Sequence, residues 1–370
     1  MDELTRAFLI KKFGEYYKNE KLEMPVEFDK REWAFVLLEN LPSFVMRRHI
    51  SFRSFQDFQA FVTSKVPAHI YYSSAYYLKP EIEKMEDKGW IKADLIFDVD
   101  ADHIPLKSKS YKAALNRAKK EIFKLYNVLI TEFGIDEKKI KIFFSGSRGY
   151  HIHVYEEDFQ LLSSSERREI VDYLTINTER ILNGRGFYDS LRAQQVSKLL
   201  TKYLKYLIKK EKLIDMLKAY RIRDVERVYT ILSTSENLKR IENGDLSFLP
   251  KYKGLRMLIN DLTDKILNNL RIYIDAPVTA DVKRLIRMPS SLHGKTGLKV
   301  VEIKIDELDS FNPFCNAVVF GDEKVKVRIL KRASFEIMGE KYSVRAGEKL
   351  TLPEYAAILL MCRGIALYGH

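Results

Sequence analysis

The sequence predicts an α/β protein of mixed sheets flanked by helices, with an inserted subdomain that is mainly α-helical. Residues 1–162 alternate helical periodicity with short apolar runs of strong β propensity. Helical periodicity with few β signals then persists through 163–270, and strand character returns at 271–275 and 298–305. We therefore expect one discontinuous domain, made of residues 1–162 plus 271–370, and a helical insertion at 163–270.

The elements of the first part follow from hydrophobic spacing. Helical periodicity predicts helices at 4–17 and at 111–133, the second of them basic and amphipathic. Residues 92–100 are rich in β-forming side chains and predict one short strand. Two further strands are expected at 141–144 and 150–155, on either side of a Ser-Gly-Ser-Arg-Gly turn.

Two capping patterns mark helices in the later parts. Ser163 and Glu166 have the spacing of a capping box and open the helical insertion. Thr351 and Glu354 have the same spacing ahead of the apolar run 355–362, which predicts a short C-terminal helix. Within the insertion, lysines alternate with leucine and tyrosine residues, namely Lys198, Lys202, Lys205, Lys209 and Lys210.

Composition restricts the classes of partner and compartment. The 370 residues carry a formal net charge of +12, which favours a polyanionic partner, although a densely charged surface of a heat-adapted protein is the alternative. Cys315 and Cys362 are too few for a disulfide framework or a Cys-rich zinc site. No apolar run approaches the roughly 20 residues of a membrane span, and we expect a soluble, cytoplasmic protein.

The first chemical motif is an acidic strand end. Asp98 and Asp100 are two residues apart, so in a strand they share one face with backbones roughly 7 Å apart. Two such carboxylates suit a divalent cation, because Mg²⁺ prefers a few carboxylates completed by substrate phosphates. The alternative is an acidic strand end that faces solvent.

The second motif is the turn between the strands at 141–144 and 150–155. Its small residues let backbone N–H groups approach an anion, while Arg148 and His151 add donors suited to a triphosphate. Two alternatives remain open from spacing alone. His151 and His153 could form a metal-binding pair, or the segment could be a glycine-containing hairpin with an incidental arginine.

The third motif begins at Asp275, which we expect to end a short strand and to supply a third carboxylate. A helix of one or two turns should follow and end at Pro289, with Lys283 and Arg287 on one face. Like charges so placed repel, which favours a position opposite phosphates. The Gly-Lys-Thr at Gly294 resembles the end of a Walker A loop, but the glycine which that loop requires is replaced by Pro289.

Taken in this order, the three motifs resemble the signature motifs of the archaeal/eukaryotic DNA primase small subunit, most closely those of archaeal members. The segments 48–52 and 71–75 also resemble the N-terminal part of this family. The resemblance covers about 1–155 and 270–305. It implies the primase catalytic fold for the discontinuous domain.

The resemblance also implies roles for individual residues. The catalytic, metal-binding carboxylates would be Asp98, Asp100 and Asp275. The residues that bind the nucleotide would be Ser145, Arg148 and His151, with Arg287 and His293 from the other side, and Arg48.

The activity implied is DNA-dependent nucleotidyl transfer, in which two Mg²⁺ or Mn²⁺ ions assist primer synthesis from nucleoside triphosphates on a single-stranded DNA template during replication. The implied partner is a primase large subunit with an iron–sulfur cluster, in a heterodimer. A metal-dependent nuclease and a non-catalytic nucleic-acid-binding subunit are the alternatives. A nuclease would not need the triphosphate-shaped second motif, and a binding subunit would not need three carboxylates.

One feature departs from the family pattern. Many members hold a structural zinc between the first two motifs, but residues 101–144 contain no cysteine and only His103. We therefore expect no zinc, and a turn marked by Pro105 should lead directly into the basic helix at 111–133.

Overall fold

The computed structural model describes residues 1–104, 111–176 and 191–369. The chain divides into two compact units, one made of Met1–Val171 with Tyr273–His370 and the other of Asp172–Ile272. The first unit is mixed α/β with several sheets, and the regular elements described in the second are helices.

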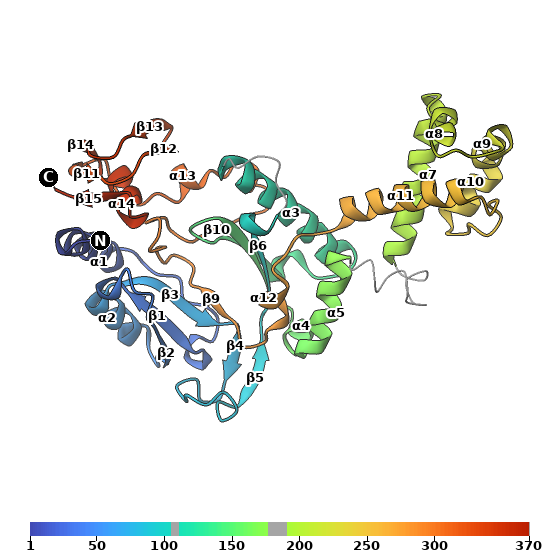
Figure 1. Ribbon diagram of the computed structural model, residues 1–370. Coiled ribbons are helices and arrows are strands. Elements are labelled where there is room, and N and C mark those ends of the chain that lie inside the picture. The colour runs from blue at the N-terminus through green and yellow to red at the C-terminus, as the bar shows by residue number, and fades with distance from the viewer. Residues whose placement is uncertain (105–110, 177–190, 370) are drawn as a thin grey trace. The chain divides into compact units, whose positions relative to one another are not determined.

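The N-terminal part of the first unit is a four-stranded antiparallel sheet covered by two helices (Figure 1). The strand order is β2-β1-β3-β9, with β2 (Met46–Ile50), β1 (Trp33–Leu37), β3 (Pro67–Ser73) and β9 (Leu285–Arg287). The helices are α1 (Glu3–Asn19) and α2 (Phe55–Lys65), and the 3₁₀ turns η1 (Phe28–Lys30) and η2 (Leu38–Asn40) flank β1. Trp33, Phe35 and Phe58 are fully buried between sheet and helices, so aromatic packing fixes this layer.

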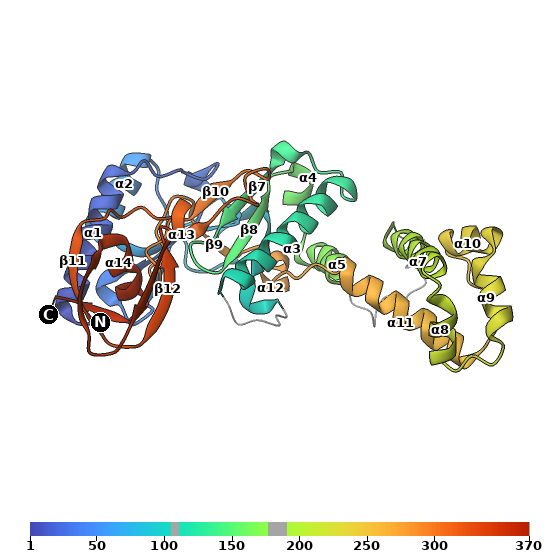
Figure 2. The same ribbon diagram turned by 90° about the horizontal axis from the view of Figure 1, so that it is seen from above.

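The second sheet of this unit carries the first two motifs. Its order is β10-β7-β8-β6, with β10 (Val301–Ile303), β7 (Ile140–Phe144), β8 (Gly149–Val154) and β6 (Leu95–Asp100). All its pairs are antiparallel, and Asp98 lies opposite His151 in the register. Helix α3 (Tyr111–Thr131) packs on this sheet (Figures 1 and 2), and its buried residues include Leu115, Ile122 and Leu125.

Short elements surround the second sheet. They are the ribbon β4 (Ala75–Tyr77) and β5 (Trp90–Ala93), the turns η3 (Ala101–His103) and η4 (Glu137–Lys139), and the helices α4 (Glu157–Gln160), α5 (Ser164–Thr175) and α12 (Ala276–Ala280). The Ser163 capping box is formed, because the Ser163 amide donates to the Glu166 carboxylate at 2.7 Å.

The C-terminal part adds a small sheet beside α1. Its order is β14-β11-β15, with β14 (Lys349–Pro353), β11 (Lys324–Ile329) and β15 (Ala366–Tyr368). The same part also contains a hairpin of β12 (Ala333–Ile337) and β13 (Glu340–Val344), and the helices α13 (Pro313–Asn316) and α14 (Glu354–Cys362). Phe8 stacks on Tyr368 with ring centroids 4.3 Å apart, so the two ends of the chain lie side by side (Figure 1).

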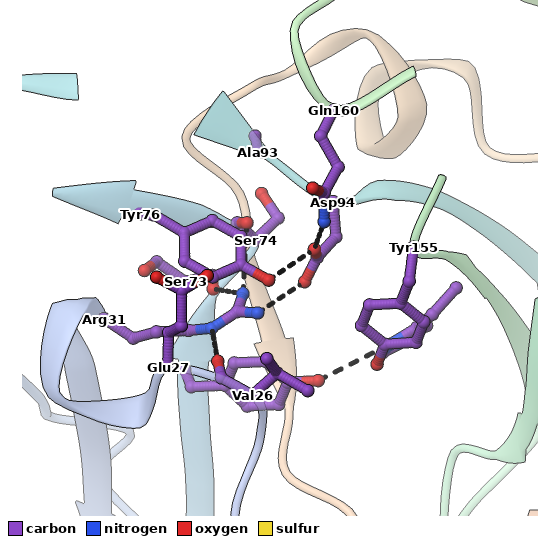
Figure 3. A network of polar contacts seen from close by, with 12 residues as sticks. Val26, Glu27, Arg31, Ser73, Ser74, Tyr76, Ala93, Asp94, Tyr155 and Gln160 are labelled. Carbon is purple, nitrogen blue, oxygen red and sulfur yellow. Dashed lines mark hydrogen bonds and ion pairs between the residues drawn. The ribbon is translucent and has the colours of Figure 1, made fainter. Parts of the chain in front are cut away.

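A buried ion pair connects the two four-stranded sheets (Figure 3). Arg31, just before β1, lies 2.7 Å from the carboxylate of Asp94, just before β6, and both side chains are fully buried. Tyr76 and Gln160 donate hydrogen bonds to the same carboxylate at 2.8 and 2.7 Å. Arg31 also donates to the carbonyl oxygen of Ser73 at the end of β3. The ion pair therefore fixes the start of β6, the strand that carries Asp98, to the other sheet.

The second unit is built from α7 (Leu191–Lys209), α8 (Leu213–Ala219), α9 (Val225–Ser233), α10 (Ser235–Glu242) and α11 (Lys253–Leu270) (Figure 2). Its core is almost wholly leucine and isoleucine. Leu204, Leu258 and Leu232 are fully buried, which is the outcome expected of amphipathic helices that bury one face.

Several predicted elements are confirmed and others are wrong. The helices at 4–17 and 111–133 and the strands at 141–144 and 150–155 are present within a residue or two. Residues 92–100 form two strands, because the backbone of Asp94 bonds outside the ladder, to Ser74 and Arg167.

The segment 271–275 is not a strand. Its amides bond to different parts of the chain and not to one neighbouring strand. The Tyr273 amide donates to the Glu121 side chain, and the Asp275 amide donates to the carbonyl of Asp98. The C-terminal helix is present, but Thr351 lies in β14 and Pro353 is the N-cap, so the second capping box is wrong.

The turn expected at Pro105 lies outside the described residues. Within the described ranges, none of the helices combines the length and apolar character needed to cross a membrane.

Candidate active site

One large cavity of about 1340 Å³ lies in the first unit, and both four-stranded sheets contribute to its walls. Eight of the nine residues proposed for the site from the sequence line it: Arg48, Asp98, Asp100, Ser145, Arg148, His151, Arg287 and His293. They come from positions separated by more than 200 residues, so the fold brings the three motifs together around one space.

The acidic side of the cavity is the end of β6. Burial raises the pKa of Asp98 to about 7, and the negative charges of Asp100 and Asp275 contribute to the same shift. A carboxyl between two other carboxylates binds a proton more tightly because its ionised form is repelled. A divalent cation shared by these oxygens would relieve the repulsion, so the donor set fits Mg²⁺ or Mn²⁺.

Asp275 is not among the residues that line the cavity. It lies at the N-cap of α12, where its side chain makes no capping bond, and its amide donates to the Asp98 carbonyl at 2.8 Å. This bond fixes it beside β6. In the described part of the chain no three His, Cys, Asp or Glu side chains are already grouped as metal ligands.

His151 lies across the ladder from Asp98, with its Nε2 atom 3.5 Å from the Asp98 carboxylate. Burial and the charges of Arg287 and Arg284 lower the pKa of His151 to about 3, so the ring is neutral. His153 stacks behind it at 6.1 Å, and its Nδ1 atom is near the hydroxyls of Tyr72 and Tyr155. His153 is thus surrounded by two tyrosine hydroxyls and the ring of Phe143, whose centroid is 4.7 Å away.

The glycine turn is held tightly between β6 and the third motif. A Cβ atom at Gly149 would lie 2.7 Å from the Val99 carbonyl, and one at Gly146 would lie 2.8 Å from the Cβ atom of His293. Thr296 donates a hydrogen bond to the Gly146 carbonyl at 2.6 Å. Larger residues would separate these segments, which explains the glycines in the motif.

Ser145 and Arg148 differ in their surroundings. The Ser145 hydroxyl accepts a hydrogen bond from the Gly149 amide at 3.2 Å and so closes the turn. Arg148 is more than half exposed and lies 2.7 Å from the equally exposed carboxylate of Asp102. The hydrogen bond to Asp102 raises the pKa of Arg148, which remains charged.

The opposite wall is cationic and centred on Arg287. The expected helix around Lys283 and Arg287 is wrong: the segment pairs with β3 as strand β9, which places Arg287 opposite Tyr71. Arg287 lies 2.6 Å from Nδ1 of His69 and 3.2 Å from the Tyr71 hydroxyl. Backbone hydrogen bonds to the edge of β3 therefore determine the conformation of this segment, and its helical spacing does not.

His69 was missed by the sequence reasoning. Its ring packs against that of His293 at 4.8 Å, edge to face. Burial, followed by the charge of Arg287, lowers the pKa of His69 to about 2 and that of His293 well below its usual value. His69 precedes Tyr71 by two residues in β3 and shares its face, and this alternation was the available signal.

Arg48 enters from β2 and is held by a buried carboxylate. Its Nε atom lies 2.9 Å from Glu32, whose side chain is 1% exposed. The fully buried Lys88 lies 3.4 Å from the other oxygen of Glu32. Glu32 was not identified from the sequence.

Further cations line the same cavity, namely Lys283, Arg284, Lys295 and Arg363. The last of these comes from the end of α14, in the C-terminal part that carried no motif. The cavity therefore combines one acidic edge with several cationic walls, an arrangement suited to metal-bound polyphosphate.

Comparison with known proteins agrees with this arrangement. The profile of the family described as DNA primase small subunit matches residues 97–305. A DNA primase small subunit PriS of Archaeoglobus fulgidus is 48% identical over 365 residues, which cover 99% of each chain. Relatives of the same name from Methanococcoides burtonii and Methanothrix thermoacetophila are 37% and 38% identical over the full length of both chains. The chain belongs to the DNA primase small subunit family.

Proposed function

We propose that this chain is the catalytic subunit of a DNA primase, which joins nucleotides into a short primer on a single-stranded DNA template during replication. The observation that carries the proposal is the acidic edge of β6, where Asp98 and Asp100 face a cavity whose other walls hold Arg48, Arg148 and Arg287. Transfer of a nucleotidyl group needs carboxylates to hold cations and cationic donors to hold a triphosphate.

The carboxylates Asp98, Asp100 and Asp275 would hold the divalent cations. Mg²⁺ or Mn²⁺ held by these residues would lower the pKa of the primer 3′-hydroxyl and neutralise charge on the departing pyrophosphate. Asp98 must lose its proton to act as a ligand, and His151 stays neutral beside it. A neutral His151 adds no charge that would compete with the cations, and its ring keeps one N–H for a phosphate oxygen.

The triphosphate would bind between the glycine turn and the Arg287 wall. Arg148 needs only to exchange Asp102 for a phosphate, and an exposed ion pair of this kind is worth about 1 kcal/mol at most. Arg287 is already oriented by His69 and Tyr71, and His293 lies beside them. Ser145 closes the turn that presents Arg148, and Arg48, oriented by Glu32, faces the same cavity.

The helical unit 172–272 supports the proposal of an inserted helical subdomain within a primase catalytic fold. On this view residues 1–162 plus 271–370 form the catalytic domain and 163–270 the insertion. We also propose that the chain works in a heterodimer with a primase large subunit, and that it contains no structural zinc. Elemental analysis of the purified protein tests the last point, and one zinc per chain would contradict it.

Incorporation of labelled nucleotides on a single-stranded template, with Mg²⁺ or Mn²⁺ and with or without the large subunit, tests the proposed activity. We expect metal-dependent primers whose synthesis is lost in the Asp98→Ala variant. Cleavage of the template without incorporation would indicate a nuclease instead, and metal-independent binding without either reaction would indicate a non-catalytic subunit.

A further inference from the structure

Helix α7 (Leu191–Lys209) has one face in the core of the helical unit and one face in solvent. Val196, Leu200, Leu204 and Leu207 are buried against the other helices of the unit. The opposite face carries four exposed lysines at intervals of four, three and four residues, namely Lys198, Lys202, Lys205 and Lys209. Residues at these intervals lie above one another on a helix, so the four form a stripe roughly 16 Å long. We call these four residues the lysine stripe.

The lysine stripe is the centre of a wider positive surplus. Residues 172–272 contain 20 lysine and arginine residues against 12 aspartate and glutamate residues, a surplus of eight out of the +12 of the whole chain. Among the described residues, Lys205 has an acidic neighbour, Glu242, at 4.0 Å, and the other three stripe lysines have none within that distance. Unneutralised, exposed lysines in a row favour a polyanion.

Aromatic side chains flank the lysine stripe. Tyr203 and Tyr206 are 38% and 47% exposed, and their rings are stacked at 6.1 Å with an interplanar angle of 23°. Leu199, also exposed, lies beside them on the same side of the helix. Both rings are accessible from solvent, and unpaired nucleic-acid bases stack on such rings regardless of sequence.

From these contacts we infer that the solvent face of α7 binds single-stranded nucleic acid, with backbone phosphates on the lysine stripe and bases on Tyr203 and Tyr206. A duplex would offer its phosphates to the lysines, but its bases are stacked inside it and could not reach the tyrosines. An anionic membrane would require a broad apolar helix face to enter the bilayer. The broad apolar face of α7 is buried in the core of the unit, and beside the lysine stripe the exposed apolar side chains are Leu199 and the two tyrosines. None of these residues lines the cavity. If the chain copies a template as proposed, this face would provide a second contact with the template strand.

Binding of the full chain to a labelled oligothymidine, without metal and without nucleotide, tests this inference independently of any synthesis. Substitution of all four stripe lysines by glutamine should lower the affinity roughly tenfold or more. It should also make the slope of log affinity against log salt shallower by up to about 3, because each lost phosphate contact on a single strand removes about 0.7. Replacement of the same four by arginine should preserve binding.

The matched control removes the same charge elsewhere in the unit. Lys218, Lys239, Lys251 and Lys265 are exposed and are distributed over α8, α10 and α11 or the loop before it. Their joint substitution by glutamine should leave the affinity within about twofold of the unmodified chain. An equal loss in the control would overturn the inference, because net charge rather than the stripe would then determine binding.

The tyrosines have their own test. Tyr203→Leu with Tyr206→Leu keeps apolar bulk but removes the stacking surface, and should lower affinity for oligothymidine about tenfold with little change for a duplex. Equal losses for single strand and duplex would sink the assignment of bases to these rings. Retained oligothymidine binding together with loss of binding to phosphatidylserine vesicles in the glutamine variant would overturn the whole inference in favour of a membrane.

Discussion

The two four-stranded sheets of the first unit contribute opposite charges to the same cavity. The sheet β2-β1-β3-β9 supplies Arg48 and Arg287, whereas β10-β7-β8-β6 supplies Asp98 and Asp100. In the first sheet each arginine has an oriented partner, whereas in the second burial, followed by the negative charges of Asp100 and Asp275, raises the pKa of Asp98. The two arginines are thus held by residues of their own sheet or next to it. The carboxylates at the end of β6 would be stabilised by a bound cation.

The largest effect should follow from removal of the acidic edge. We expect Asp100→Ala, Asp98→Ala and Asp275→Ala to reduce primer synthesis by at least about a thousandfold, since loss of a carboxylate ligand removes stabilisation that only the transition state receives in full. Asp158→Ala, at an exposed acid on α4, is the matched control and should keep normal synthesis. Melting curves should show that all four variants fold. Near-normal synthesis by a well-folded Asp275→Ala chain would remove Asp275 from the set.

The next effect concerns the ion pair that joins the two sheets. Asp94→Ala leaves Arg31 fully buried without a counter-charge, which should lower the free energy of unfolding by about 3–5 kcal/mol. The comparison is Glu39→Ala, which breaks the exposed pair of Arg47 and Glu39 and should cost less than about 1 kcal/mol. Urea denaturation measures both. Similar costs for the two variants would mean that the sheets are held together by packing alone.

A smaller effect is expected on the cationic side. Arg148→Ala and Arg287→Ala should each remove a charge-assisted hydrogen bond worth about 1.5–3 kcal/mol. The KM for nucleotide should therefore rise roughly 10- to 150-fold, with less change in DNA affinity. Arg287→Lys should not restore the KM, because one ammonium group cannot hold the planar arrangement with His69 and Tyr71, whereas Arg148→Lys should restore part of it. Steady-state kinetics at saturating template measures these values. Weaker DNA binding with an unchanged KM would reverse the assignment.

The smallest effect, and one of opposite sign, should come from removal of the Asp98 charge, which burial and the neighbouring carboxylates disfavour. The pKa of Asp98 is about 7 in the folded chain and about 4 in an unfolded one, so the folded state keeps a proton that the unfolded state loses. Stability therefore falls as pH rises from about 4 to 7, and the loss is complete above that range. In chelator, Asp98→Asn should be more stable than the parent by about 1–2 kcal/mol at pH 8 and by less at pH 5. An equal difference at both pH values would argue against ionisation of Asp98 as its source.

Local spacing predicted the elements that its own residues stabilise. The helices at 4–17 and 111–133 bury one face each, and the strands at 141–144 and 150–155 have strong β propensity. Local spacing gave the wrong element where the backbone bonds to residues far away in the sequence. Arg287 reads as helical by spacing to Lys283 but is captured by β3, and Asp275 bonds to Asp98 rather than ending a ladder.

What the sequence determined by itself was the family, and it predicted most of the residues that line the cavity, because the Asp-x-Asp pair, the glycine turn and the long third motif are each contiguous in the chain. Which residues orient these groups was decided only by the tertiary structure. His69, Glu32 and Arg363 lie in segments without chemical motifs. Strand register and helix packing place His69 and Arg363 in the cavity wall and place Glu32 against Arg48, which lines the cavity. Such partners are set by contacts between residues far apart in the chain, and no local periodicity records them.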